Sequence, residues 1–389
     1  MKVCHVITRM IVGGAQENTF LSALGLYEAG HDVTLLTGPS SGPEGELLKQ
    51  CGDIPFRVVE YPRLCRNISP INDMLTFFHL VRFFRKEKFD VVHTHSSKAG
   101  IVGRYAATVA HVPIVVHTIH GLPFSFTLYS KWKNFFYIIL ERWAAKHCTK
   151  ILAVAQDMID QCRKQNIGYD GLFEVVYSGM RLKDYLGFSP NQELRTTLGI
   201  PPDVPVVATL ARLFYGKGYM ELWRSIPEIL KRIPNTCFLI IGNGVLRDEL
   251  ERISTEKGFR EHIVFAGLIP PKDVPKYLSL ADVLVHFSRR EGLPRAAVQA
   301  LALKIPVVAF DVDGTREVVI DGETGYLIQD LEQETPGVEQ ICGLLENKGK
   351  RIELGSAGCE LIKRNFDWKM MSNHLIKIYQ KLLQNGIKR

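Results

Sequence analysis

Short apolar runs rich in Val and Ile alternate along the chain with longer segments whose apolar residues recur every three or four positions. This alternation is typical of parallel β-sheets whose strands are joined by crossover helices. In the first half it predicts strands at 3–8, 32–36, 56–59, 91–94, 114–118 and 151–154, and helices near 15–29, 70–86, 97–110 and 130–146. In the second half it predicts strands at 204–210, 237–241, 263–266, 283–286, 307–310 and 326–328. Because the strand runs are continuously apolar, we expect both faces of each sheet to be buried.

A polar, proline-containing stretch at 191–203 separates the two series of strands. The chain of 389 residues also exceeds the length of a typical domain, which is about 100–200 residues. We therefore predict an N-terminal α/β domain at 1–184, a C-terminal α/β domain at 185–366 and a final helix at 367–389, after a break at 366–368. Two open parallel sheets would place their strand ends around one cleft, where we expect a nucleotide to bind.

The composition is ordinary for a soluble globular protein, with 46% hydrophobic and 23% charged residues. No apolar stretch approaches the roughly 18–20 residues of a membrane-spanning helix, and the first residues resemble a strand rather than a signal peptide. The eight cysteines are scattered and form no Cys-x-x-Cys pair. We therefore expect reduced thiols in a cytoplasmic protein, with no disulfide and no thiolate zinc site.

The net charge of +7 is concentrated in one segment. Residues 82–150 contain eleven basic and three acidic residues, a surplus of eight positive charges. Such a surplus can attract a partner that carries phosphate, such as an anionic membrane surface or a lipid diphosphate. Nucleic acid is the other possibility, but the segment has no recognised nucleic-acid-binding motif, so we expect no such partner.

The same basic segment contains a predicted helix with a stripe of large apolar residues. They fall at helical spacing with basic residues beside them: Trp132, Phe135, Phe136, Ile139, Leu140 and Trp143. A helix that packs on the sheet is the default interpretation, and a helix at a membrane interface is the alternative that the basic residues keep open.

Two cations follow the predicted strand at 204–210. Arg212 lies just after the strand, and Lys217 and Gly218 open the next helix. A guanidinium can fork onto two phosphate oxygens, an ammonium adds a point charge, and a helix N-terminus attracts anions. Groups that converge in this way stabilise the negative charge on a departing diphosphate. The loop therefore predicts a diphosphate site, with an ordinary solvated loop as the alternative.

A second group of candidates follows the predicted strand at 283–286. Gly292 permits a close backbone approach, and Pro294 suits the first turn of a helix. We expect Glu291 at the entrance of this helix, where its carboxylate can accept hydrogen bonds from sugar hydroxyls. Gln299 would lie about 12 Å further along the axis on nearly the same face. The alternative is that Glu291 only caps the helix.

These motifs resemble the family 4 retaining glycosyltransferases of the GT-B fold, from the first strand to the final helix. The family signature is a Glu, seven residues and a second Glu, in a Glu-Gly-Phe-Gly or Glu-Gly-Leu-Pro context before a Pro-Val-Val-Ala strand. Here Glu291-Gly292-Leu293-Pro294 and Pro306-Val307-Val308-Ala309 match, and Gln299 replaces the second Glu. The resemblance implies that Glu291 contacts the donor sugar and that Gln299 contacts the nucleotide ribose, less strongly than a carboxylate would.

A further departure from the family pattern is Asp313, where the family usually has glycine. It could add a carboxylate that reads the sugar, although a turn-forming aspartate is the simpler explanation.

The resemblance extends to the N-terminal half. Gly13-Gly14-Ala15-Gln16 matches the glycine-rich turn that in the family approaches the donor phosphates and the acceptor. It is not a dinucleotide fingerprint, because the third glycine is missing and the second strand does not end in an acid. His120 aligns with the family histidine near the donor sugar.

Four histidines lie at the ends of adjacent predicted strands: His93, His95, His117 and His120. Such a group can suggest a metal, but no cysteine is near and no carboxylate is paired with it at ligand spacing. We therefore expect no metal and no cofactor. For any one of these histidines, a structural hydrogen bond is as plausible as contact with substrate.

The resemblance implies two Rossmann-like domains facing across a cleft, with the C-terminal helix packing back on the N-terminal domain. It implies a metal-independent hexosyltransferase that uses a nucleotide sugar, with UDP favoured and GDP as the alternative. The acceptor would be a glycan or lipid-linked molecule in surface polysaccharide or glycoconjugate assembly, at the cytoplasmic side of the membrane. The competing hypotheses are a catalytically weak sugar-nucleotide-binding or scaffolding subunit, suggested by Gln299, and an epimerase or phosphorylase of related fold.

Overall fold

The structure is a computed structural model that describes residues 1–40, 45–124 and 130–387. It divides into two compact units, one formed by Met1–Met180 with Asp367–Arg389 and the other by Arg181–Phe366. The polar stretch at 191–203 belongs to the second unit, where it contains helix α7 (Gln192–Thr197).

The described part of the N-terminal unit has one sheet of seven parallel strands in the order β3-β2-β1-β4-β5-β6-β7. The strands are β1 (Lys2–Ile7), β2 (Asp32–Thr37), β3 (Arg57–Glu60), β4 (Val91–His95), β5 (Ile114–Ile119), β6 (Lys150–Ala153) and β7 (Phe173–Val175). The helices are α1 (Gly14–Glu28), α2 (Leu47–Gln50), α3 (Pro70–Glu87), α4 (Ser97–Val109), α5 (Lys131–Ala145), α6 (Gln156–Lys164) and α14 (Trp368–Ile387).

Helices cover both faces of this sheet, as the continuously apolar strands predict. Val3 packs in the core beneath α1 and α14, whereas the next residue, Cys4, packs in the core beneath α3 and α4. Successive strand residues point to opposite faces, so both must be apolar when both faces are covered. A Cβ atom on Gly25 of α1 would lie 2.1 Å from Oγ of Ser372, which shows how closely α14 packs. The predicted return of the C-terminal helix to this unit is confirmed.

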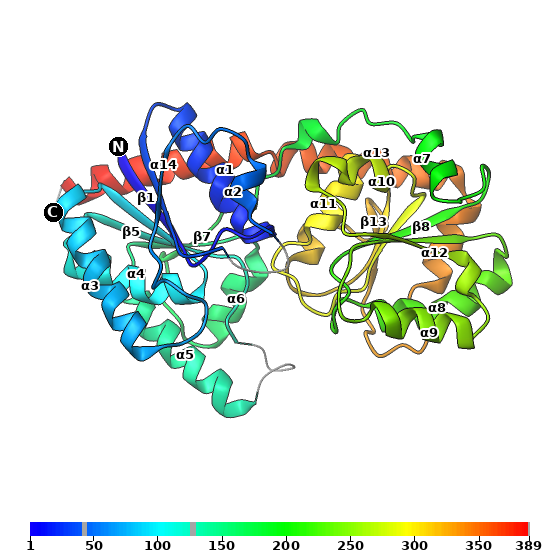
Figure 1. Cartoon of the computed structure of the whole chain (residues 1–389), viewed down its shortest axis with the longest axis horizontal. Coiled ribbons are helices and arrows are strands. Elements are labelled where there is room, and N and C mark those ends of the chain that lie inside the picture. The colour runs from blue at the N-terminus through cyan, green and yellow to red at the C-terminus, as the bar shows by residue number, and fades with distance from the viewer. Residues whose placement is uncertain (41–44, 125–129, 388–389) are drawn as a thin grey trace. The chain divides into compact units, whose positions relative to one another are not determined.

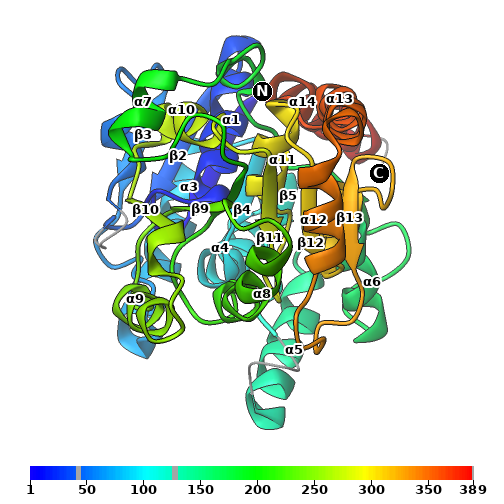
Figure 2. The same ribbon diagram turned by 90° about the vertical axis from the view of Figure 1, so that its right-hand side faces the viewer.

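The C-terminal unit repeats the plan with six parallel strands among its residues, in the order β10-β9-β8-β11-β12-β13. The strands are β8 (Val206–Leu210), β9 (Cys237–Ile241), β10 (Ile263–Gly267), β11 (Val283–His286), β12 (Val307–Phe310) and β13 (Gly325–Ile328). The other helices are α8 (Tyr219–Arg232), α9 (Arg247–Glu256), α10 (Val274–Leu278), α11 (Arg295–Ala302), α12 (Val338–Glu346) and α13 (Lys348–Asn365), with 3-10 turns η1 (Leu182–Asp184), η2 (Arg260–His262), η3 (Pro271–Asp273) and η4 (Asp313–Glu317). Figures 1 and 2 show α8 and α9 on one face of the sheet and α11 and α13 on the other.

Each sheet has one point where the strand order reverses. In the N-terminal unit β1 pairs with β2 and β4, and in the C-terminal unit β8 pairs with β9 and β11. The loops after the two middle strands diverge there, which leaves space at the carboxyl edge of the sheet, where ligands of such folds bind. The expected sites follow β1 and β4 in one unit, and β8 and β11 in the other.

The predicted strands are all present within a few residues of their expected bounds, and the predicted α/β class with two Rossmann-like units is confirmed. The sequence did not predict β7, because the strand has only three residues and Phe173 is the one among them that is buried. No helix in the described ranges combines the length and apolarity that crossing a bilayer requires.

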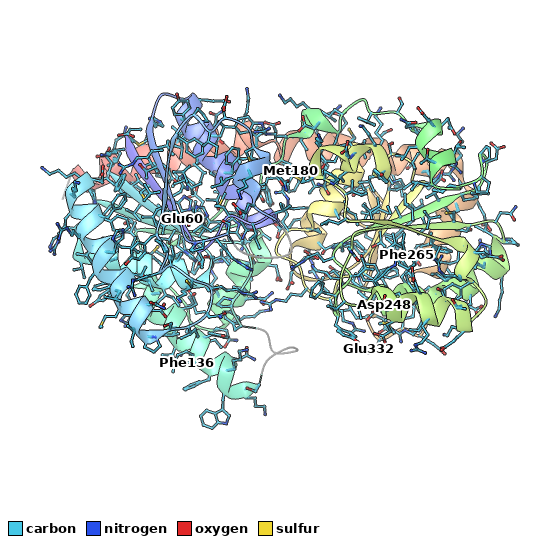
Figure 3. The ribbon with its side chains drawn as sticks, in the orientation of Figure 1. Glu60, Phe136, Met180, Asp248, Phe265 and Glu332 are labelled. Atoms are coloured by element: carbon cyan, nitrogen blue, oxygen red, sulfur yellow. The ribbon has the colours of Figure 1, made fainter. Side chains whose placement is uncertain are left out.

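Helix α5 corrects the default interpretation of its apolar stripe. The side chains buried against the unit are the small or polar Asn134, Glu141, Ala144 and Ala145, with Ile138. Most of the large apolar residues point outward instead: Trp132, Phe135, Phe136, Ile139 and Trp143. Figure 3 shows Phe136 on this helix. The stripe is therefore a surface feature of the unit rather than part of its core.

Candidate active site

Two loops of the C-terminal unit are in backbone contact at the reversal point between β8 and β11. Gly218 ends the first loop with a φ of +82°, in the left-handed region that favours glycine. A Cβ atom there would lie 2.3 Å from the carbonyl oxygen of Phe287, the first residue after β11. The N–H of Arg289 also donates to the carbonyl oxygen of Gly216 at 2.9 Å. The absence of a side chain at Gly218 therefore brings the two loops together.

Glu291 is the centre of a charge cluster formed by these loops. Its Oε1 lies 2.7 Å from Nζ of Lys217 and 3.2 Å from Nε2 of His286, and its side chain is 13% exposed. Burial alone would raise the pKa of Glu291, but the charge of Lys217 and the contact with His286 outweigh it and lower the pKa to about 2. Glu291 is therefore a carboxylate at physiological pH, suited to accept hydrogen bonds rather than to donate a proton.

The backbone of Glu291 is held by Asp313. Its N–H donates to Oδ2 of Asp313 at 2.7 Å. Asp313 has a φ of +44°, which glycine adopts without strain and aspartate tolerates better than most residues. This conformation explains why the family pattern usually has glycine at this position. The bond to Glu291 supports the simpler of the two expected roles of Asp313, that of a turn residue.

The two predicted cations lie on the loop after β8. Lys217 immediately precedes Gly218, and α8 begins one residue later, so a helix N-terminus follows the ammonium as expected. Arg212 is exposed, and its guanidinium carbon lies 5.1 Å from the centre of the Phe214 ring. The loop therefore presents a lysine fixed by Glu291 and an arginine near the surface, and their diphosphate role stays a prediction.

The helix after Glu291 begins later than the sequence indicated. α11 starts one residue after Pro294, so Pro294 is the N-cap residue rather than part of the first turn. Glu291 lies in the loop ahead of the helix, together with Gly292 and the buried Leu293. The expectation that Glu291 and Gln299 share one helix face is therefore wrong, because only Gln299 is helical.

Gln299 lies within α11 and bonds to a residue far away in sequence. Its Nε2 donates to the hydroxyl oxygen of Tyr185 at 2.7 Å, and Tyr185 is buried. An amide has two N–H donors and a carbonyl acceptor, so this bond uses one donor and sets the orientation of the side chain. We therefore expect a nucleotide ribose to meet an amide that is already oriented.

In the N-terminal unit, the Gly13–Gly14 turn lies where it was predicted, between β1 and α1. Gly14 is the first residue of the helix, and Gly13 precedes it in an extended conformation. The helix N-terminus thus stands at the reversal point of this sheet, a position that attracts phosphate groups. Its contact with the donor stays a prediction.

His120, just after β5, is the outer member of a row of histidines. Nε2 of His120 lies 3.0 Å from Nδ1 of His95, and Nε2 of His95 lies 2.9 Å from Nδ1 of His5. Within the described residues, Nε2 of His5 has no hydrogen-bond partner. If each ring of the row donates through Nδ1, Nε2 of His5 carries a lone pair and no hydrogen. A buried lone pair without a partner costs less free energy than a buried N–H without a partner. This arrangement favours the neutral tautomer of His120 that carries its hydrogen on Nδ1.

Three of the buried histidines are close enough together to hold a metal ion. Nitrogen atoms of His5, His93 and His95 lie within 4.8 Å of one another. The rings, however, already bond to other groups: His93 lies 2.5 Å from the Tyr379 hydroxyl and 2.7 Å from the Thr118 hydroxyl, and His5 bonds to His95. A metal would have to replace these bonds, which suit neutral imidazole rings that bond to one another and to hydroxyl groups.

We accordingly predict that activity persists in a strong chelator, because the cations of the loop after β8 supply the positive charge that a metal would otherwise provide. The measurement is transferase activity before and after dialysis against EDTA. Loss of activity that Zn²⁺ or Mg²⁺ restores would contradict the prediction, and a matching loss in His93→Gln would place the metal at the histidines.

The histidines also predict how stability depends on pH. Burial lowers the pKa of His5 to about 3 and lowers the pKa values of His93, His95 and His117 well below 6.5. In the folded chain these rings therefore stay neutral, whereas in the unfolded chain they bind protons below about pH 6.5. Because proton binding favours the unfolded chain, the free energy of unfolding is highest above that pH and falls as the pH falls. Each ring that stays neutral lowers the free energy of unfolding by about 1.4 kcal/mol for each pH unit below that value.

The measurement is the free energy of unfolding in urea at pH 7.5, 6.5 and 5.5. We expect the free energy of unfolding to fall below pH 6.5. The slope of this fall should be smaller in His5→Asn by the contribution of about one proton, since asparagine keeps a donor near the Nδ1 position but does not titrate. A constant free energy from pH 7.5 to 5.5 would contradict buried, neutral imidazoles.

Two residues of the site were not predicted. His286 was assigned only to a strand, although a polar residue at the end of an apolar run, just ahead of the Glu291 loop, was a usable signal. Tyr185 lies 114 positions before Gln299 and carries no local signal that links the two.

The chain is similar in sequence to known glycosyltransferases. Residues 12–183 match the family model described as "Glycosyltransferase Family 4", and residues 190–360 match the one described as "Glycosyl transferases group 1". The chain is 31% identical over 333 residues to the Escherichia coli UDP-Gal:alpha-D-GlcNAc-diphosphoundecaprenol alpha-1,3-galactosyltransferase, covering 85% of this chain and 84% of the relative.

Two further similarities cover most of the chain. It is 24% identical over 351 residues to the Staphylococcus aureus capsular polysaccharide biosynthesis glycosyltransferase CapM, covering 88% of this chain and 89% of that one. Among solved structures, Anabaena HepE in complex with UDP superposes with a TM-score of 0.83 at 20% identity, covering 98% of this chain and 100% of that one. The structural likeness shows a shared fold.

Proposed function

The chain belongs to the family 4, group 1, glycosyltransferases, and from this premise we propose that it transfers a hexose from a UDP-sugar to a lipid-linked or glycan acceptor, with retention of anomeric configuration. The observation that carries the proposal is the Lys217–Glu291 pair at the reversal point of the C-terminal sheet, with Nζ and Oε1 2.7 Å apart. UDP is favoured because the E. coli relative is named for UDP-Gal. A GDP-sugar is the second candidate.

On the donor side, Lys217 and Arg212 stabilise the charge that develops on the diphosphate as the sugar departs. Glu291, ionised and held by Lys217, accepts hydrogen bonds from the sugar hydroxyls. Gln299 bonds to the ribose from the helix that follows. Gly292 allows the loop backbone, which continues through Leu293 and Pro294, to approach the donor.

On the acceptor side, the Gly13–Gly14 turn and His120 belong to the N-terminal unit. In the reaction the acceptor oxygen forms a bond to the anomeric carbon, the bond between that carbon and the phosphate oxygen breaks, and the acceptor proton passes to the departing diphosphate. Because attack and departure occur on the same face, no enzymic nucleophile is required. His120, donating through Nδ1, stabilises an oxygen near the reacting sugar.

The proposal is tested by thermal shift with a panel of UDP- and GDP-sugars, followed by donor hydrolysis without acceptor. We expect one class of UDP-sugar to stabilise the protein and to release UDP slowly, because water replaces the acceptor. Stabilisation without any nucleotide release would favour the scaffolding alternative, and stabilisation by GDP-sugars alone would overturn the choice of UDP.

We further propose that the N-terminal unit contacts an anionic membrane at the cytoplasmic face. Support comes from the outward stripe on α5, where Trp132 is 83% exposed and Phe135 is 56% exposed, and which lies within the segment 82–150 with its eight surplus positive charges. Apolar side chains flanked by cations are typical of interfacial helices. None of the eight cysteines forms a disulfide with another residue that the structure describes, which agrees with a cytoplasmic location.

We predict that the protein binds vesicles containing phosphatidylglycerol more strongly than neutral ones, and less strongly as salt rises. Each well-placed cation contributes about 1 kcal/mol before screening. The measurement is vesicle sedimentation, with Trp132→Ser expected to weaken binding and Leu268→Ser, an exposed apolar residue of the other unit, as the matched control. Equal sedimentation with both kinds of vesicle would contradict the proposal.

A further inference from the structure

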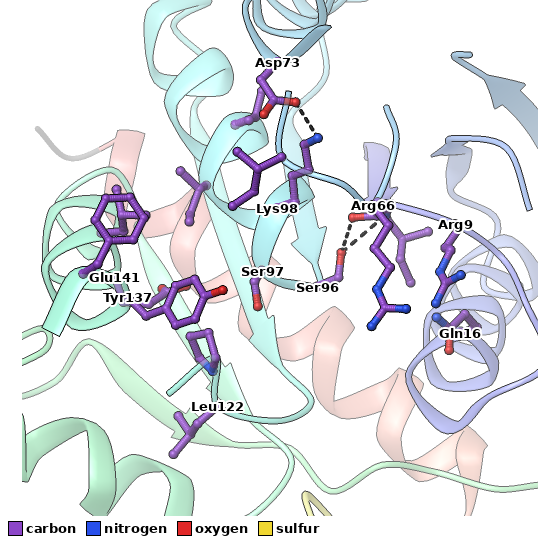
Figure 4. Close-up of a pocket in the computed structure, with 18 residues that line it drawn as sticks. Arg9, Gln16, Arg66, Asp73, Ser96, Ser97, Lys98, Leu122, Tyr137 and Glu141 are labelled. Carbon is purple, nitrogen blue, oxygen red and sulfur yellow. Dashed lines mark hydrogen bonds and ion pairs between the residues drawn. The ribbon is translucent and has the colours of Figure 1, made fainter. Parts of the chain in front are cut away.

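The loops at the reversal points of the two sheets are arranged differently. In the N-terminal unit, the segments after β1 and β4 line a cavity of about 570 Å³, whose lining includes Arg9, Gln16 and Ser97 (Figure 4). In the C-terminal unit, the loops after β8 and β11 are in backbone contact, and the segment after β12 reaches the same point through Asp313. The positions of the donor-side groups therefore depend on contacts between loops.

Asp313 has a backbone conformation that favours glycine. It is the first residue of η4, and its φ is +44°. A side chain in this left-handed region costs free energy that glycine avoids. Residues that keep such a conformation cluster at functional sites, where the side chain has a role that glycine cannot perform. The carboxylate of Asp313 is therefore a candidate for such a role.

The carboxylate of Asp313 holds the loop that carries Glu291. The N–H of Glu291 donates to Oδ2 of Asp313 at 2.7 Å, although the two residues are 22 positions apart in sequence. Two residues earlier, the N–H of Arg289 donates to the carbonyl oxygen of Gly216, which ties the same loop to the loop after β8. The backbone at Glu291 is thus held by the segment after β12 as well as by its own loop.

The carboxylate of Glu291 is held by Lys217, but the ammonium of Lys217 is shared. Its Nζ lies 2.7 Å from Oε1 of Glu291 and 3.4 Å from Oγ of Ser288. In the proposed reaction the same ammonium also stabilises the diphosphate. A second anion competes with Glu291 for Lys217, whereas the bond from the backbone of Glu291 to Asp313 does not involve Lys217.

We propose that Asp313 is a positioning residue of the transferase. It fixes the backbone of Glu291, so that the carboxylate of Glu291 keeps one orientation toward the donor sugar while Lys217 binds the diphosphate. The inference rests on the proposed function and deepens it. It goes beyond the role of a turn residue, because a turn requires only the backbone conformation, which glycine provides.

Two substitutions separate the backbone conformation of Asp313 from its carboxylate. Asp313→Gly keeps the conformation and removes the bond to Glu291, so kcat should fall about 10-fold while the Kd of UDP stays within about 2-fold of the parent value. Asp313→Asn keeps an acceptor oxygen and tolerates the positive φ, so it should recover most of that loss. Asp203→Gly, which removes an exposed aspartate of the same unit, is the matched control and should keep full activity.

The measurements are steady-state transfer, calorimetric binding of UDP and the melting temperature of each variant. An Asp313→Gly variant with the kcat of the parent would overturn the proposal, because the conformation alone would then be sufficient. An Asp313→Asn variant as impaired as Asp313→Gly would also overturn it, since both variants would have lost more than an acceptor for the N–H of Glu291.

A double-mutant cycle shows whether Asp313 acts through Glu291. In a Glu291→Ala background there is no carboxylate to position, so adding Asp313→Gly should change kcat by no more than about 2-fold. A loss as large in this background as in the parent would show that Asp313 contacts the sugar itself, and would overturn the proposal.

Failure of the proposed function would look different. The parent chain would then bind a UDP-sugar without releasing UDP, and the ratio of its affinities for the UDP-sugar and for UDP would still test Asp313. This ratio should fall by a similar factor in Glu291→Ala and in Asp313→Gly, and a fall in Glu291→Ala alone would overturn the inference. A parent that binds no nucleotide sugar would remove the proposed function and the inference together.

Discussion

Lys217→Ala is expected to lower kcat/KM by about 10²-fold or more, equivalent to about 3 kcal/mol of transition-state stabilisation. Its ammonium is placed to neutralise the departing diphosphate, and it also holds Glu291 through the 2.7 Å contact. Arg212→Ala is expected to lower kcat/KM by a similar factor, because the Arg212 guanidinium, exposed on the loop after β8, is proposed to bind the same diphosphate.

The measurement is steady-state transfer with the donor that the panel identifies, together with the melting temperature of each variant. Lys272→Ala, which removes an exposed lysine of the same unit, is the matched control and should retain full activity. We expect both active-site variants to keep the fold, because neither side chain belongs to the hydrophobic core. Near-normal turnover in both variants would remove the diphosphate assignment.

Gln299→Leu is expected to weaken binding of the nucleoside diphosphate by about 1–3 kcal/mol, the cost of leaving ribose hydroxyls without partners in a closed site. Gln299→Glu should preserve activity and tighten donor binding, because a carboxylate accepts charge-assisted bonds from both ribose hydroxyls. The Tyr185 hydroxyl can donate to that carboxylate, so the contact across 2.7 Å survives the change.

The contact with Tyr185 supplies a control for this series. Tyr185→Phe removes the hydroxyl that orients Gln299 but leaves the amide in place, so its effect on nucleotide affinity should be smaller than that of Gln299→Leu. Glu291→Gln should reduce turnover more than nucleotide affinity, because its proposed partner is the sugar. All four variants are compared by calorimetry with the free nucleoside diphosphate and by turnover. A Gln299→Leu variant that binds the nucleotide as tightly as the parent would show that Gln299 has no part in ribose recognition.

The strands could be predicted because burial on both faces imposes a continuous apolar run that is visible locally. Cys237–Ile241 and Val283–His286 were predicted with the bounds that the structure has. The contact between Lys217 and Glu291 could not be predicted in the same way. It depends on β8 and β11 lying in register, with Val283 beside Val207, and on the close approach of Gly218 to Phe287. Such contacts join segments that are far apart in sequence, and no periodic pattern of apolar residues indicates them.

Helix α5 shows the other limit. Its large apolar residues recur at helical spacing, which indicates an amphipathic helix but not which of its faces packs on the protein. The structure buries the face with Asn134 and Glu141 because Glu141 pairs with Arg104, which is fully buried on α4. That ion pair joins two helices, and the sequence of α5 alone gives no sign of it.

The most direct test of the whole account is a transfer assay with the purified full-length chain in EDTA. A labelled UDP-hexose is supplied with a sugar linked to a polyprenyl diphosphate, and both UDP and glycolipid are measured. The account predicts UDP release in equal amount to a glycolipid extended by one hexose in the retained anomeric configuration, with both lost together in Lys217→Ala. No extended product from any UDP- or GDP-sugar, while the parent chain binds the donor, would contradict it.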